Sequence, residues 1–153
     1  MIRNQTVRTA LSALAILVFG FILLNATFIL YVIWGSLLDL VFGADYAANH
    51  SWFLILQYVI FLIIIGLISW LVLRSKIRPI YKAIFSTVPF AAGFVTIGIF
   101  LFSWPVAVYS ISALAAIATL YYFYRTQKIW FYWFALIAVA LALGIFTSIG
   151  GDI

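Results

Sequence analysis

Long uncharged apolar runs, separated by short polar connections, form the pattern of this chain. The first run, residues 9–38, is thirty residues long and carries no charge. As a single helix it is ~45 Å long at ~1.5 Å per residue, whereas the hydrocarbon core of a bilayer is ~30 Å thick. We therefore expect this helix to tilt, to bend at Gly20 or Gly35, or to project; either glycine can instead be a packing site.

The second run, residues 52–73, matches one bilayer crossing. Trp52 opens it and Trp70 lies near its other end. Trp side chains prefer the depth of the lipid headgroups, so both ends carry the expected interfacial anchors. This run predicts one membrane-spanning helix.

Residues 83–124 are also uncharged, but ~63 Å of helix is too long for one crossing. The natural division is at Ser103-Trp104-Pro105, because Ser103 can cap a helix and Pro105 is tolerated in a first turn. The predicted spans are therefore 83–102 and 105–124.

Two further features complete the pattern of spans. Pro89 lies inside the span 83–102 and predicts a bend there, because its ring opposes the carbonyl of Phe85. The last apolar run, residues 129–149, ends at two glycines. The sequence thus predicts an all-α integral membrane protein, a bundle of five transmembrane helices forming a single membrane domain over residues 1–153.

The distribution of charge predicts which way the bundle faces. Four of the eight positive charges fall between the second and third spans, at Arg74, Lys76, Arg78 and Lys82. Loops rich in Lys and Arg stay on the cytoplasmic side. With five spans and a cytoplasmic N-terminus, all eight Lys and Arg lie inside, whereas all three Asp and the C-terminus lie outside.

The composition agrees with a membrane protein and indicates which partner its positive charges meet. The chain is 69% hydrophobic and only 7% charged, which excludes a water-soluble domain. Its net charge of +5 comes from residues that flank spans, which favours anionic lipid headgroups over nucleic acid as their partner. The short loops and compact chain favour the inner membrane of a bacterium.

Groups that perform chemistry are scarce. The chain has no Glu, no Cys and one His, so thiolate metal sites and thiol nucleophiles are excluded. Asp39, Asp45 and His50 form the one titratable cluster, in the connection after the first span. We interpret it as a solvated outer loop and expect no metal and no cofactor; the alternative is an enzyme or metal site at the outer face.

Asn25 and Gln57 are the strongly polar side chains within the spans. An amide in hydrocarbon needs a hydrogen-bond partner, which is usually another helix. Contact with a substrate or ion is the alternative interpretation, because polar residues inside spans are frequently functional.

Small residues recur at helical spacing on the last two spans. Such surfaces let membrane helices approach closely. They serve packing within the chain or docking of another protein. The candidate face consists of Ser112, Ala116, Ala138, Ala142 and Gly144, with Ala140 one turn before Gly144.

Every residue is aromatic in two segments, 121–124 and 130–134, which flank the connection between these two spans. An interfacial belt explains the Trp and Tyr among them. A lipid or quinone-like ligand between the helices is the alternative.

These features favour a non-catalytic accessory or structural subunit of a larger membrane assembly, whose partners are other subunits or further copies of itself. The alternative is a carrier or binding protein for a neutral or lipid-like small molecule, with Asn25, Gln57 and the bend at Pro89 lining its site.

Overall fold

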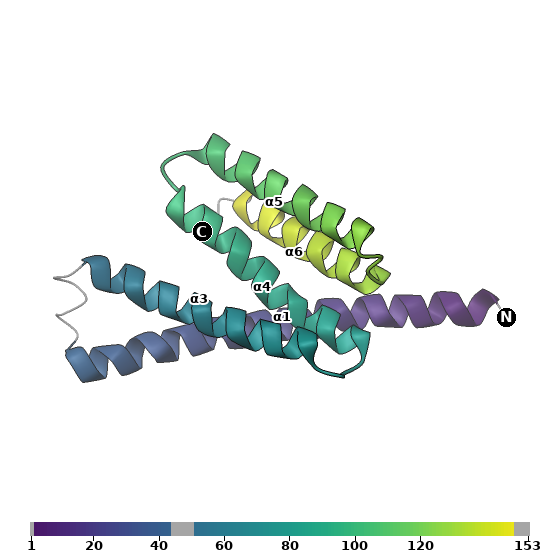
Figure 1. Ribbon diagram of the computed structural model, residues 1–153, viewed down its shortest axis with the longest axis horizontal. Coiled ribbons are helices and arrows are strands. Elements are labelled where there is room, and N and C mark those ends of the chain that lie inside the picture. The colour runs from purple at the N-terminus through teal and green to yellow at the C-terminus, as the bar shows by residue number, and fades with distance from the viewer. Residues whose placement is uncertain (1, 44–50, 149–153) are drawn as a thin grey trace.

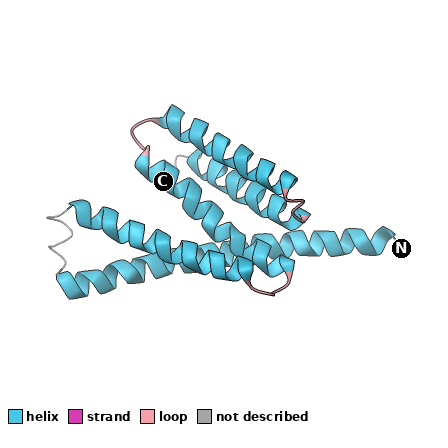
Figure 2. Cartoon of the chain, viewed as in Figure 1, coloured by secondary structure: helices cyan, strands magenta, loops and turns pink. Residues whose placement is uncertain are grey.

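The computed structural model describes residues 2–43 and 51–148, and this part of the chain is helical with short connections (Figures 1 and 2). Each of its five helices is long and apolar enough to cross a membrane, which confirms the predicted number of candidate membrane-spanning helices. The helices are α1 (Ile2–Phe42), α3 (Ser51–Arg74), α4 (Pro79–Phe100), α5 (Pro105–Arg125) and α6 (Trp130–Ser148).

Two helices begin several residues before the apolar runs that predicted them. α1 begins at Ile2, because the polar residues before Thr9 include neither Gly nor Pro and so continue the helix. α4 begins at Pro79, four residues before the predicted start, with the proline in its first turn. Lys82 therefore lies inside α4, which continues as one helix through Pro89.

The predicted division between the third and fourth spans is confirmed, but its cap is not. The residue that caps α5 is Trp104, not Ser103, and no side chain bonds to the free N–H groups of the first turn. The turn is held by backbone bonds instead, among them the one from Trp104 N–H to Leu101 O at 2.8 Å.

α4 is the central helix, in contact with α1, α3, α5 and α6. The best buried point of the bundle lies where three helices meet: Ile16 of α1, Ala83 of α4 and Ala135 of α6 are all fully buried. One turn further along α1, Gly20 faces Thr87, and a Cβ on Gly20 would lie 2.9 Å from the Thr87 methyl carbon. Gly20 is therefore a packing site.

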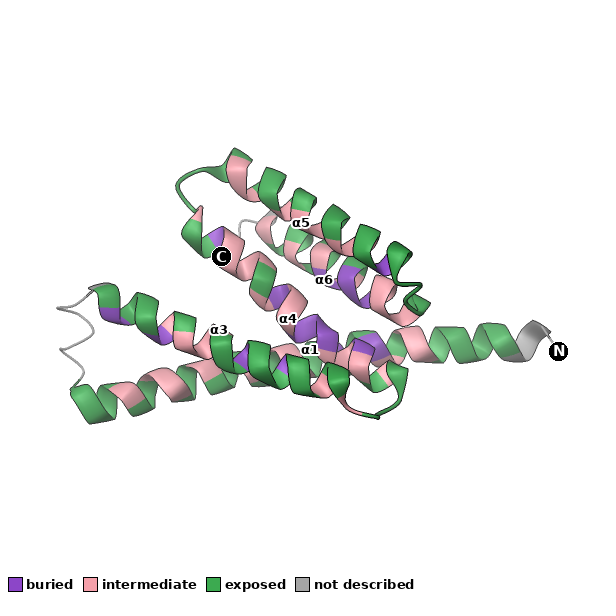
Figure 3. Cartoon of the chain, viewed as in Figure 1, coloured by how far each residue is buried: buried purple, intermediate pink, exposed green. Residues whose placement is uncertain are grey.

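The N-terminus of α1, the α3–α4 loop and the α5–α6 turn lie toward the same end of the molecule, here called the basic end (Figure 1). α1 extends past the other helices at this end, and every side chain from Gln5 to Leu11 is exposed (Figure 3). The ten residues before Ser12 correspond to ~15 Å of helix. We expected the first helix to tilt, to bend or to project because of its length, and the structure shows that it projects past the other helices.

Candidate functional site

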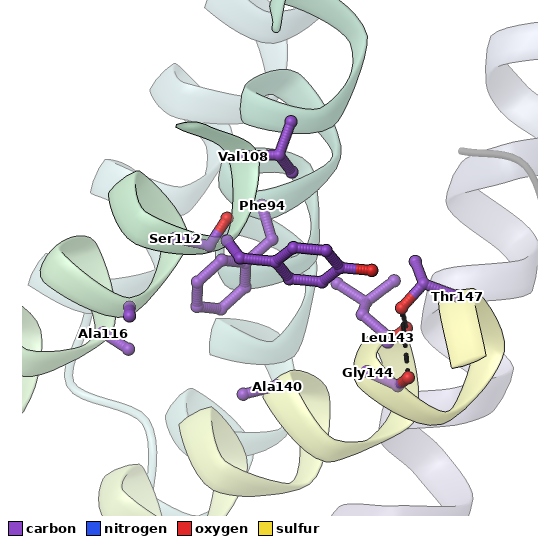
Figure 4. A pocket seen from close by; sticks show the side chains of 10 residues that line it. Phe94, Val108, Ser112, Ala116, Ala140, Leu143, Gly144 and Thr147 are labelled. Carbon is purple, nitrogen blue, oxygen red and sulfur yellow. Dashed lines mark hydrogen bonds between the residues drawn. The ribbon is translucent and has the colours of Figure 1, made fainter. Parts of the chain in front are cut away.

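A cavity of about 190 Å³ lies between α4, α5 and α6, in the half of the bundle away from the basic end. Figure 4 shows Ser112 and Ala116 of α5 facing Ala140 and Gly144 of α6, with Phe94 of α4 behind them. Because these facing side chains on α5 and α6 are small, the two helix surfaces leave space between them. Three of the five predicted small-face residues thus line one cavity.

Few polar atoms line this cavity. Its hydroxyls belong to Tyr109, Ser112 and Thr147. The Thr147 hydroxyl lies 3.1 Å from Leu143 O and 3.0 Å from Gly144 O, so its own helix satisfies it. An apolar cavity of ~150 Å³ in another protein binds benzene. This cavity therefore suits an apolar group of similar size, such as a large side chain or part of an acyl chain.

The other two predicted small-face residues, Ala138 and Ala142, lie on a different side of α6. They line a cavity of about 170 Å³ between α1, α4 and α6, together with Gly20 and Thr87. The small residues of α6 therefore serve two surfaces, one turned toward α5 and one turned toward α1.

Asn25 and Gln57 differ in their surroundings. Asn25 is exposed, and its Nδ2 donates to Phe21 O of the same helix at 2.8 Å. Gln57 is buried between α1 and α3, with an exposed fraction of 8%. Its Nε2 lies only 2.8 Å from the place where a Cβ on Gly35 would be, so Gly35 makes room for it.

One polar contact between helices and one unpaired polar atom inside the bundle were not predicted. The Tyr58 and Thr96 hydroxyls are 3.0 Å apart and join α3 to α4. Thr96 also donates to Ala92 O, so the proton between the two hydroxyls comes from Tyr58. The buried indole Nε1 of Trp34 has no hydrogen-bond partner in the described part of the chain. Polar atoms of Tyr and Thr within the spans were the available signal for these contacts.

Pro89 faces a cavity that neither amide lines. It lines a third cavity, of about 150 Å³, between α4, α5 and α6, which shares Phe94 with the larger one. Neither Asn25 nor Gln57 is among the residues that line it. None of these three cavities is lined by more than one of the three residues expected to form a ligand site.

Two of the four basic residues in and beside the α3–α4 loop have structural contacts. Lys82 Nζ donates to Leu73 O at 2.7 Å and so caps the end of α3, while the Arg74 guanidinium lies 5.1 Å from the centre of the Trp70 ring. Lys76 and Arg78 are exposed. These two side chains are the most available for lipid headgroups.

The aromatic residues of α5 and α6 pack around Phe123, which is 5% exposed. Its ring centre is 6.0 to 6.2 Å from those of four other rings. These contacts occupy Phe90, Tyr122, Tyr132 and Trp133. Packing between helices explains this part of the aromatic group.

The titratable cluster is described only at one member. Asp39 is exposed near the end of α1, while Asp45 and His50 lie outside the described residues. Within residues 2–43 and 51–148, no three His, Cys, Asp or Glu side chains are grouped so that they could hold a metal ion.

No protein-family model matches this chain, and neither a curated protein nor a solved structure does so.

Proposed function

We propose that this chain is a non-catalytic integral membrane protein that serves as an accessory or structural subunit of a larger membrane assembly. Its basic end faces the cytoplasm, since eleven charges sort across five spans without exception. Lys76 and Arg78 then contact anionic headgroups. The short loops favour the inner membrane of a bacterium as its location.

The observation that carries this proposal is the cavity between α5 and α6. Ser112, Ala116, Ala140 and Gly144 line it with little side-chain volume, and it is otherwise apolar. A groove of this kind receives a large side chain of a partner helix, because close packing is what holds helices together in lipid. The partner is therefore another membrane-spanning helix.

The test is purification of the tagged full-length protein from its native host in a mild detergent. We expect a membrane protein to co-purify, and Ala116→Leu to release it by filling the cavity. Ala118→Leu is the matched control, because Ala118 is an exposed alanine of the same helix that does not line the cavity. Purification without any companion protein, or equal loss in both variants, contradicts the proposal.

A second candidate is binding of a neutral, lipid-like molecule in the same cavity. The apolar lining and the hydroxyls of Tyr109 and Ser112 favour it, because one end of such a ligand requires a polar contact. Mass spectrometry of the purified protein distinguishes the two. A retained small molecule that Ala116→Leu removes supports the second candidate, and its absence leaves the first.

A further inference from the structure

Asn25 places an incompletely paired amide on the outer surface of α1. Its Nδ2 gives one hydrogen to Phe21 O, while the second N–H and the Oδ1 atom have no hydrogen bond in the described part of the chain. Gly20 packs against Thr87 of α4, so Asn25, little more than one turn on, is level with the middle of α4. At that depth no water is present to satisfy the amide.

The residues around Asn25 follow the spacing of a coiled-coil seam. Steps of four and three residues alternate without a break from Val7 to Val32, with Asn25 at an a position. All eight side chains are exposed, and the seven apolar ones have exposed fractions of 47% to 68%. This seam consists of Val7, Leu11, Leu14, Val18, Phe21, Asn25, Phe28 and Val32.

In an apolar span nearly any stripe is apolar, so the projecting part of α1 supplies the independent observation. From Gln5 to Ser12 the helix is mostly polar, and its large apolar side chains are Val7 and Leu11. Both fall on the seam that passes through Asn25. Val7 and Leu11, which are apolar residues in a polar segment, and Asn25, which is a polar residue in an apolar segment, therefore lie on the same face of α1.

We propose that this seam pairs with the α1 seam of a second copy of the chain, as a parallel two-stranded coiled coil. The orientation proposed above inserts every copy the same way, so each residue meets its own equivalent. Asn suits such a contact, because each amide donates N–H to the oxygen of the other. Asn25 is the one polar residue among the a positions of the seam, and a single Asn at such a position specifies the register and the number of strands.

Most of the seam lies away from the rest of the bundle, although Phe21 also lines the cavity between α1, α4 and α6. At ~100° per residue, Asn25 lies ~140° around α1 from Gly20, which packs on α4, and ~120° from Tyr31. The Tyr31 ring contacts Tyr58 and Phe61 of α3. One face of α1 thus holds its own bundle while the other is open to a second copy.

Single cysteines test this proposal, because the chain has no Cys. We expect Val18→Cys and Val32→Cys to form disulfide dimers on mild oxidation of the purified full-length protein in lipid vesicles. Phe19→Cys and Leu30→Cys are the controls, since both side chains are exposed at similar depths but point away from the seam. Cross-linking at the seam positions should exceed that at the controls severalfold.

The amide is tested by measuring dimerisation through energy transfer between labelled copies. Asn25→Leu should raise the dissociation constant about 3- to 30-fold for each interhelical amide bond lost, whereas Gln57→Leu, which removes a buried amide elsewhere, should not. Equal cross-linking at seam and control positions, or an unchanged constant in Asn25→Leu, overturns the proposal. Because these vesicles contain no other protein, that failure is separate from the loss of a co-purifying partner.

Discussion

The contact between Gly20 and Thr87 makes a quantitative prediction about how α1 is held. A Cβ on Gly20 would lie 2.9 Å from Thr87 Cγ2 and 3.3 Å from its Oγ1, whereas carbon atoms prefer ~3.5–4.0 Å. Thr87 has little room to turn away, because it is 3% exposed and its hydroxyl donates to Ile84 O at 2.7 Å. In Gly20→Ala, α1 must therefore retreat, loosening Ile16 one turn away.

Overpacking of this kind reduces stability by ~1–3 kcal/mol, while replacing Gly by Ala inside a helix gains up to ~1 kcal/mol. Gly66→Ala isolates the contact, because a Cβ on Gly66 meets nothing within 4 Å. We expect Gly20→Ala to be less stable than Gly66→Ala by ~1–3 kcal/mol. Unfolding by SDS in mixed micelles, followed by Trp fluorescence, measures the free energies of both variants.

Thr87→Ala provides the test of cause, because it removes the two nearest atoms that a Cβ on Gly20 would meet. The double variant Gly20→Ala, Thr87→Ala should therefore be more stable than the sum of the two single effects. The reasoning is refuted if Gly20→Ala unfolds like Gly66→Ala, or if the two effects simply add.

Three further predictions concern two other contacts and the orientation of the chain. Tyr58→Phe should lower the free energy of unfolding by ~0.6–2 kcal/mol, and Thr96→Val should add little in that background, because the two hydroxyls share one bond between helices; fully additive losses would contradict this. Lys82→Met should lower the free energy of unfolding by about 1 kcal/mol, because the hydrogen bond to Leu73 O is lost, while Lys76→Met should not lower it. Equal free energies in the two variants would show that this hydrogen bond does not stabilise the protein. In sealed cells, Trp104→Cys should react with an impermeant thiol reagent and Lys76→Cys only after permeabilisation; the reverse result inverts the proposed orientation.

Hydropathy predicted the five helices because uncharged runs between polar connections are a direct consequence of the bilayer. It misplaced two starts, since a charge marks a limit of the hydrocarbon and not of the helix. Arg8 lies inside α1, where the helix has already left the bundle, and Lys82 lies inside α4, where its long side chain reaches back to Leu73. The starts of α4 and α5 coincide with Pro79 and Pro105, whereas α3 and α5 end at Arg74 and Arg125.

The candidate site was less predictable, because it depends on how each helix is rotated. Ala138 and Ala140 look alike in the sequence, yet one lies toward α1 and the other toward α5. Asn25 and Gln57 are likewise similar amides with opposite burial. Spacing identifies residues that share a face of one helix, but the packing of all five decides which neighbour that face meets.

The meeting of Ile16, Ala83 and Ala135 has a consequence for biogenesis. These residues come from three helices that the ribosome makes well apart in time, and the central one follows α1 and α3. α1 is made long before α4 and α6, so its face around Ile16 waits for these native contacts, while the contact of Tyr31 with α3 can form earlier. Assembly is therefore completed only after α6 is inserted, and a nascent chain interrupted before that point presents an open α1 surface to the cell's proteases.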